Sequence, residues 1–175
     1  MYSLWCAREI LDDDFLLLES DIIYEDRALA ALLDSPEDSI VLLSDSTDSS
    51  DPVHVETQAG LLVAMSKDRA KLGEEIAGEL VGVSKISRDL LVTMTAIMEE
   101  SLLDRMTWHY EEDGLAAARR MPVHCSVLAG LAFFEIDDEH DIAVARSHAL
   151  GKIAERDRDR RAAERRVDAA DQPAT

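Results

Sequence analysis

The stretch from Phe15 to Asp26, FLLLESDIIYED, constrains this chain more than any other. Its short run of leucine and isoleucine is typical of a buried strand of a parallel sheet. Two carboxylates, Glu19 and Asp21, interrupt the run two positions apart and would share one side of a strand. Because an unpaired buried charge is very costly, we expect the strand to leave the sheet near Glu19. Both carboxylates would then lie at its carboxyl end, where ligands of open α/β sheets bind.

A second acidic stretch, at residues 133–141, repeats this order of apolar strand, carboxylates and helix. Glu135 and Asp137 fall on one strand face. Asp138 or Glu139 can cap the following helix, and another aspartate falls in its first turn, where a carboxylate suits the helix dipole. Two such strand ends can converge on one Mg²⁺ ion, which is usually held by one or two carboxylates together with substrate phosphates. Two unrelated acidic junctions between strand and loop are the alternative, and the residues alone favour neither.

Acidic residues dominate the charge: 37 Asp and Glu against 18 Lys and Arg give a formal net charge of −19. We expect no nucleic-acid partner, because binding nucleic acid needs a positive face. An acidic surface also repels anionic small substrates unless a cation lies between them. Such a lysine-poor, acidic composition is what we expect of a halophilic protein, since high salt screens self-repulsion. An ordinary acidic protein is the alternative.

The length of 175 residues fits one domain of ordinary size or slightly more, and 47% hydrophobic residues are enough for a real core. No apolar run approaches the roughly 20 residues of a membrane span, so we expect no membrane partner. The N-terminus lacks the pattern of a signal peptide, and two cysteines do not make a disulfide framework. The expected location is cytoplasmic.

Alternating strands and helices predict an α/β fold with a mixed, mostly parallel sheet and flanking helices. Acid and base alternate between Glu155 and Arg166, which predicts a solvated helix face without a site. The expected helices cover 3–11, 26–33, 87–103, 111–121 and 139–167, and the expected strands cover 15–24, 39–43, 53–57, 61–65, 80–85, 123–127 and 132–136.

Five short motifs follow one another in a recognisable order. They are YSLW at 2–5, the strand 15–24 with its E-x-D end, GELVGVSK at 78–85, Tyr110 with Glu111, and EID at 135–137 followed by Asp141, Ile142 and Ala145. Together they resemble motifs of the sugar-phosphate nucleotidyltransferases, most closely the branch with the CTP:phosphocholine and phosphonate cytidylyltransferases. The resemblance covers residues 2–150 and implies a Rossmann-like nucleotidyltransferase fold.

The resemblance implies a reaction. A phosphate or phosphonate oxygen of a small acceptor would attack the α-phosphorus of a nucleoside triphosphate, with CTP favoured, and pyrophosphate would leave. Mg²⁺ would be held by Asp21 and Asp137, with Glu19 supporting the metal or its waters. Lys85 would contact substrate phosphate, although a surface lysine at a strand end is the alternative for this residue.

The same resemblance assigns four residues to substrate binding. Glu79, Tyr110, Glu111 and Glu135 would line the acceptor pocket, where a cationic head group suits carboxylate and aromatic neighbours. For Tyr110 an ordinary core aromatic is the alternative.

One departure from the family concerns the start of the chain. Members begin with a strand and a G-x-G-x-R loop that binds the triphosphate, whereas the glycines here begin at Gly60 and none forms G-x-G. We expect an N-terminally truncated member, or a chain that needs a partner or a homo-oligomer to supply the missing half, and inactive when isolated. Residues 1–152 would form a nucleotidyltransferase-like domain, the C-terminal two-thirds of the family fold. Residues 153–175 would form a charged helical extension with a disordered tail.

Two other functions fit parts of the pattern. A nucleotide-sugar glycosyltransferase also places paired carboxylates at a strand end, and it would bind UDP-sugar or GDP-sugar with Mn²⁺. A catalytically inactive remnant acting as an interaction module would bind neither metal nor nucleotide.

Overall fold

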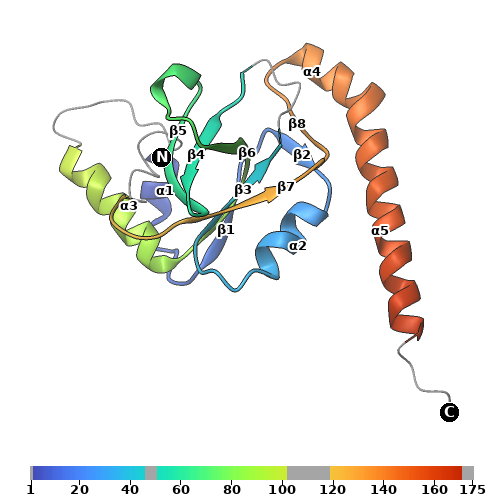
Figure 1. The fold of residues 1–175 in the computed structure, drawn as a ribbon, viewed down its shortest axis with the longest axis horizontal. Coiled ribbons are helices and arrows are strands. Elements are labelled where there is room, and N and C mark those ends of the chain that lie inside the picture. The colour runs from blue at the N-terminus through green and yellow to red at the C-terminus, as the bar shows by residue number, and fades with distance from the viewer. Residues whose placement is uncertain (1, 46–50, 102–118, 171–175) are drawn as a thin grey trace. The chain divides into compact units, whose positions relative to one another are not determined.

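The computed structural model describes residues 2–45, 51–101 and 119–170 (Figure 1). The chain separates into two compact units. The first consists of Met1–Leu18 and Leu32–Gly130, and the second of Glu19–Ala31 and Leu131–Thr175. The two acidic stretches of the sequence, from Glu19 onward and from Glu135 onward, therefore both belong to the second unit.

The first unit is built on a sheet whose order, within the described residues, is β1-β6-β3-β7-β5-β4. Its strands are β1 (Phe15–Leu18), β3 (Ile40–Ser44), β4 (His54–Gln58), β5 (Leu61–Ser66), β6 (Ile76–Ile86) and β7 (His124–Leu128). Its helices are α1 (Tyr2–Ala7), the short 3₁₀ helix Arg69–Lys71 and α3 (Arg88–Ser101).

The sheet is mixed, but the expectation that it is mostly parallel was wrong. The long strand β6 runs antiparallel to β1, β3 and β4, and β4 and β5 form the expected hairpin. Among the pairings of the described strands, only β3 with β7 is parallel. Because β4 also pairs with β6, the described strands β6, β3, β7, β5 and β4 close into a ring.

Two glycines of the GELVGVSK motif have structural reasons. A Cβ atom at Gly78 would lie 2.1 Å from the carbonyl oxygen of Ser44, so only glycine lets β6 pass the end of β3 so closely. Gly82 has φ of 81°, a conformation that glycine adopts without strain, and it falls where the β3–β6 register shifts. These two positions are thus explained by the sheet alone.

The core of the first unit lies between the sheet and α3. All five residues of β3 are buried, and Leu90, Leu91 and Met94 of α3 are fully buried against the sheet. The Ser87 hydroxyl accepts the Leu90 N–H at 3.1 Å and so caps the helix. The predicted amphipathic helix after residue 86 is confirmed.

The second unit pairs two short strands, β2 (Ile22–Tyr24) and β8 (Phe133–Glu135), in an antiparallel sheet. Helix α2 (Arg27–Leu33) begins in this unit. After β8 the chain forms α4 (Glu139–Val144), a π-helical turn (Ala145–Ala149) and α5 (Leu150–Ala170). The prediction of one helix across 139–167 holds, with the π turn as an unforeseen irregularity.

Several expectations need correction or lie outside the description. The single strand expected at 15–24 divides at Glu19 into β1 and β2, which belong to different sheets. The first helix ends at Ala7, earlier than expected. Most of the helix expected at 111–121, with Tyr110 and Glu111, lies outside the described residues, as does the tail 171–175. No described helix has the length and apolar character needed to cross a bilayer.

Candidate metal centre

The pairing of β2 with β8 brings the two acidic stretches together. Ile22 lies opposite Glu135 in the antiparallel register. One residue beyond this pair, the Ile136 N–H donates to the carbonyl oxygen of Asp21 at 2.7 Å. The residue before β2 and the residues after β8 are therefore held at the same end of this small sheet.

Three carboxylates meet at this end. Asp21, Glu135 and Asp137 each offer one oxygen atom, and these three atoms lie within 4.8 Å of one another. We call this group the candidate metal centre. Its donors are all hard anionic oxygens, which suit Mg²⁺, Mn²⁺ or Ca²⁺ and not a soft thiophilic metal. Of the two alternatives left open by the sequence, the structure has the one in which the acidic stretches meet, with Asp21 and Asp137 both exposed to solvent. The expectation that Asp21 lies at the carboxyl end of a strand was wrong, because it directly precedes β2.

The remaining acid of the second stretch has a structural use. Asp138 is the N-cap of α4, and its Oδ1 accepts the backbone N–H groups of His140 at 2.7 Å and Asp141 at 3.0 Å. The Asp141 carboxylate in turn accepts the N–H groups of Asp137 and Asp138. This capping box fixes the backbone of Asp137 where the chain turns from β8 into α4.

Glu19 is not part of this three-carboxylate group. It lies in the connection between β1 and β2, so it does not share a strand face with Asp21 as the sequence suggested. Glu135, which the sequence assigned to substrate binding, takes the third position instead. The supporting role of Glu19 stays a prediction.

The other predicted site residues in the description belong to the first unit. Glu79 and Lys85 lie on β6, where Glu79 faces Ser44 at one end of β3 and Lys85 faces Ile40 at the other. Glu79 is buried, and the Lys85 ammonium group donates to the carbonyl oxygen of Ser35 at 3.3 Å. These two residues are therefore separated along the strand, and their roles stay predictions.

Solved structures with a similar fold are nucleotidyltransferases. The inositol-1-phosphate CTP transferase from T. maritima matches with a TM-score of 0.63 and 16% identity, over 87% of this chain and 61% of that one. The CTP:phosphocholine cytidylyltransferase from Streptococcus pneumoniae matches with a TM-score of 0.57 and 14% identity, over 83% and 61%. A UTP-bound UGPase from Acinetobacter baumannii matches with a TM-score of 0.57 and 14% identity, over 84% and 54%.

The chain shares the fold of these solved structures. No protein-family model matches the sequence, and the identities are low, so the likeness concerns the fold alone. The chain covers 61% of the length of each of the first two of these structures. The fold expected from the five sequence motifs is confirmed at this level.

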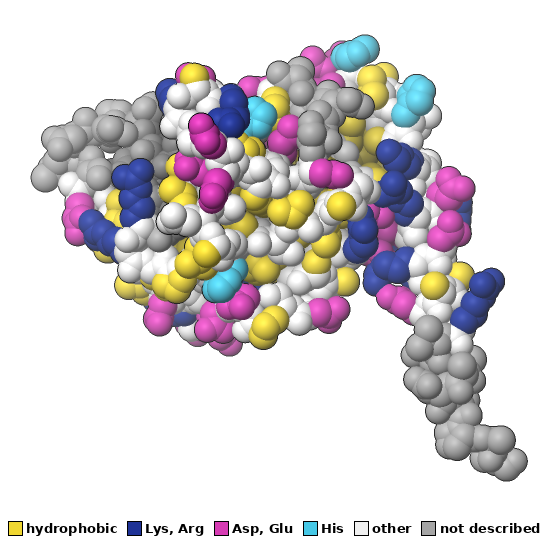
Figure 2. Space-filling model, viewed as in Figure 1, with side chains coloured by type: hydrophobic (Ala, Val, Ile, Leu, Met, Phe, Trp, Pro, Cys, Tyr) yellow, Lys and Arg dark blue, Asp and Glu magenta, His cyan; other side chains and the backbone are white. Residues whose placement is uncertain are grey.

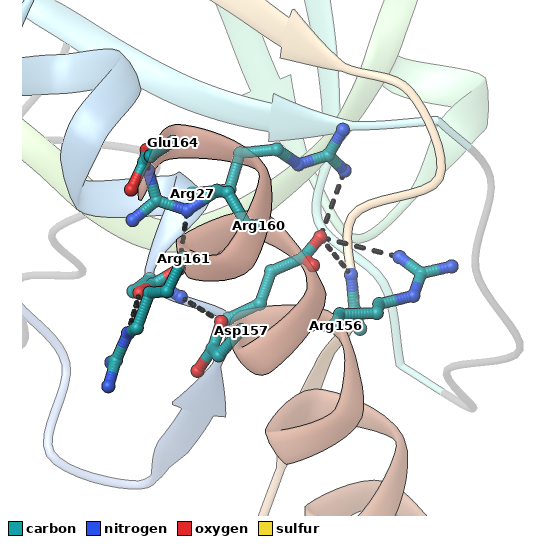
Figure 3. Close-up of polar contacts among 9 residues, drawn as sticks. Arg27, Arg156, Asp157, Arg160, Arg161 and Glu164 are labelled. Carbon is teal, nitrogen blue, oxygen red and sulfur yellow. Dashed lines mark hydrogen bonds and ion pairs between the residues drawn. The ribbon is translucent and has the colours of Figure 1, made fainter. Parts of the chain in front are cut away.

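Sequence reasoning missed a second acidic feature of this chain. Glu25 and Asp26 follow β2, and we call them the anchored pair. Glu25 is only 4% exposed. Its Oε1 atom accepts hydrogen bonds from Arg27 at 2.9 Å, from Arg156 at 3.3 Å and from the Ala132 N–H at 3.0 Å (Figure 3). A buried carboxylate with this many charged and polar donors is well compensated.

Asp26 is held by the next turn of α5. Its two carboxylate oxygens accept from Arg160 at 2.8 Å and from Arg161 at 3.1 Å, and its N–H donates to Asp157 at 2.9 Å. The Arg160 hydrogen bond holds the pKa of Asp26 well below its usual range. Burial, together with the nearby Asp26 carboxylate, raises the pKa of Asp157.

The charged face of α5 therefore has a partner, and the expectation of a purely solvated face was wrong. Arginine side chains gather along this helix among acidic ones, as Figure 2 shows. The residues that contact the anchored pair, Arg156, Asp157, Arg160 and Arg161, recur at the spacing of one helix face. This spacing was the only sequence feature that indicated an inner face of α5, and it did not identify Glu25 and Asp26 as the partners.

A pocket of about 340 Å³ lies in the first unit, at the ends of β3 and β7 where these strands begin. Its lining includes Glu37, Ser39, Ser87 and His124, and the His124 Nε2 atom lies 3.0 Å from Glu37. Among the described residues, none of those that the sequence assigned to a site lines this pocket.

Proposed function

We propose that this chain is a nucleotidyltransferase that transfers a nucleoside monophosphate, with CMP from CTP favoured, to a small phosphate or phosphonate acceptor and releases pyrophosphate. The observation that carries the proposal is the convergence of Asp21, Glu135 and Asp137 in a chain with this fold. Two of the similar structures are an inositol-1-phosphate CTP transferase and a CTP:phosphocholine cytidylyltransferase, and both are named for a phosphate monoester. Their chemistry favours CTP and a phosphate monoester here.

The residues of the candidate metal centre fit Mg²⁺. Three carboxylate oxygens within 4.8 Å of one another can turn toward a common ion, and carboxylates are its preferred protein ligands. Asp21 and Asp137 would be ligands, as the sequence suggested, and Glu135 would be a third. When bound there, Mg²⁺ would supply neutralisation of the phosphate charge that develops during transfer.

The chain's own charges make such a cation necessary for substrate binding. Three carboxylates in one group repel a triphosphate, and the net charge of −19 adds to that repulsion. Asp21, Glu135 and Asp137 would hold the cation, and its charge would offset their repulsion of the triphosphate. Nucleotide binding is therefore expected only in the presence of a divalent metal.

The remaining sequence assignments belong to the proposal as supporting roles. Glu19 would support the metal or its waters, and Lys85 would contact substrate phosphate. Glu79, Tyr110 and Glu111 would contribute to the acceptor pocket.

Because the isolated chain is expected to need a partner or a second copy for turnover, binding and not catalysis is the first test. Among the described strands β1 pairs only with β6, which leaves its other edge open to a further strand.

The test is calorimetric titration of the chain with CTP in the presence of Mg²⁺ at high salt. Binding should vanish without Mg²⁺ and in the variant Asp21→Asn/Asp137→Asn, because both remove the charge balance at the candidate metal centre. The matched control is Asp34→Asn/Asp159→Asn, which removes two exposed carboxylates outside the group. A folded wild-type chain that binds no CTP, or equal binding by both double variants, would contradict the proposal.

A further inference from the structure

We propose that Glu25 is a positioning residue for the candidate metal centre, and that α5 holds it in place through Arg156. The proposal rests on the function proposed above, because it concerns the metal affinity of Asp21, Glu135 and Asp137. Glu25 itself is outside that group and is not a metal ligand. Its effect would pass through the pairing of β2 with β8.

The small sheet needs such a device. Strands β2 and β8 have three residues each, and an isolated pair of strands this short is marginally stable. A slip of one residue would turn every side chain to the other face of the sheet. The residue opposite Ile22 would then no longer be Glu135, and the three carboxylates would not meet.

Hydrogen bonds beyond the strands close both ends of this pairing. At one end the Ile136 N–H donates to the Asp21 carbonyl at 2.7 Å, beside the carboxylates. At the other end the Glu25 N–H donates to the Ala132 carbonyl at 3.0 Å, and the Ala132 N–H donates back to the Glu25 side chain at 3.0 Å. Glu25 therefore forms hydrogen bonds to Ala132 with both its main chain and its side chain. These two bonds fix the register between β2 and β8.

The hydrogen bond from the Ala132 N–H to the Glu25 side chain depends on charged neighbours. Glu25 is 4% exposed, and the guanidinium groups of Arg27 at 2.9 Å and Arg156 at 3.3 Å hold its carboxylate in place and compensate for its burial. Arg27 comes from the start of α2 and Arg156 from α5. Helix α5 is thereby connected to the candidate metal centre through one buried carboxylate, as in metal sites whose ligands are oriented by outer hydrogen bonds.

The experiment measures Mn²⁺ binding to the full chain by electron paramagnetic resonance, using Mn²⁺ as the probe for the oxygen ligands. Glu25→Ala should lower the affinity by about tenfold or more, the range seen when an outer partner of a metal ligand is removed. Glu25→Gln keeps an acceptor oxygen for the Ala132 N–H and should recover part of the loss. Asp26→Asn is the matched control, because the Asp26 carboxylate also accepts hydrogen bonds from α5, whereas the Ala132 N–H donates to Glu25.

Amide exchange gives a second readout that does not depend on metal. The Ala132 and Ile136 amide protons should exchange faster in Glu25→Ala than in Asp26→Asn, because only the first variant loosens the register. If Glu25→Ala does not fold, Glu25→Gln and Arg156→Gln carry the same comparison with smaller expected changes.

The outcomes separate the two proposals. Loss of Mn²⁺ binding in Asp21→Asn together with unchanged affinity in the Glu25 and Arg156 variants would overturn the positioning role and leave the proposed function standing. No Mn²⁺ binding by the wild type would overturn the metal centre, and equal amide exchange in Glu25→Ala and wild type would overturn the positioning role by itself.

Discussion

The second unit contains two groups of carboxylates in opposite surroundings, and Asp21 of one group is only five positions from Asp26 of the other. At the candidate metal centre, Asp21 and Asp137 are exposed, and within the described residues no ion pair to either carboxylate is present. At the anchored pair, Glu25 and Asp26 are held by arginines of α2 and α5. Within the described residues, Asp21 and Asp137 therefore have no cationic partner from the chain, whereas the anchored pair has its cations supplied by the chain.

This difference shows that acidic character alone does not identify a metal site. Asp21 and Asp26 are five positions apart on either side of β2, yet the arginines that neutralise Asp26 come from more than 130 residues further along the chain. What separates the two groups is the origin of the compensating charge. Changes that add or remove this charge should therefore affect the two groups in opposite directions.

The largest effect should come from adding metal. A divalent ion that binds only the folded chain at 100 times its dissociation constant raises the free energy of unfolding by about 2.7 kcal/mol. Denaturant unfolding with and without Mn²⁺ measures this shift. It should be lost in Asp21→Asn/Asp137→Asn and kept in Asp26→Asn; an equal shift in both variants would mean that the ion binds elsewhere.

A somewhat smaller effect is expected from removing the buried member of the anchored pair. Glu25→Ala leaves the Ala132 N–H without its side-chain acceptor and two guanidinium groups without their shared oxygen. The expected loss in free energy of unfolding is about 2 kcal/mol, typical of an orphaned buried donor. Urea unfolding without metal measures it. By contrast Asp21→Asn should leave stability unchanged or raise it, because it reduces repulsion among carboxylates.

The smallest effect concerns Asp26 and acid. Its pKa is depressed in the folded chain, so its ion pairs stabilise the fold above the usual Asp pKa of about 3.9 and lose this contribution as the pH falls further. The raised pKa of Asp157 acts in the opposite sense and reduces the net change. Asp26→Asn should cost about 1 kcal/mol at pH 7, and the difference from wild type should shrink below pH 4. Urea unfolding across this pH range gives the result, and a difference that grows in acid would show that Asp26 is not stabilised by its arginines.

The sequence revealed the residues of the candidate metal centre, but it did not reveal how the strands pair. The two acidic stretches were visible in the sequence as carboxylates beside apolar runs, but the residues alone favoured neither their convergence nor two unrelated junctions. The direction of strand pairing is not local: nothing in Ile76–Ile86 states that it runs antiparallel to three neighbours. The division of the first strand at Glu19 was also only half visible, because no glycine or proline marks where β1 gives way to β2.

The anchored pair was invisible for a further reason. Arg156 and Arg160 lie on α5, whose polar residues are spread around the helix without a clear apolar face. Ile153 is a buried apolar residue of this helix. Hydrophobic periodicity therefore could not indicate the inner face of α5. The spacing of the arginines gave the face, but the partner residues come from the distant segment at Glu25.

The π turn at Ala145–Ala149 sets the rotational phase of everything after it. There the Leu150 N–H donates to the Ala145 carbonyl, five residues back, so this turn holds one residue more than an α-helical turn. Deleting this extra residue would convert the turn into an α-helical one and keep α5 in phase with α4, whereas inserting a further residue would rotate α5 by about 100° relative to α4. After such an insertion Arg156 and Arg160 would point away from Glu25 and Asp26, and the gain of one codon would disconnect the helix without altering any of its charges.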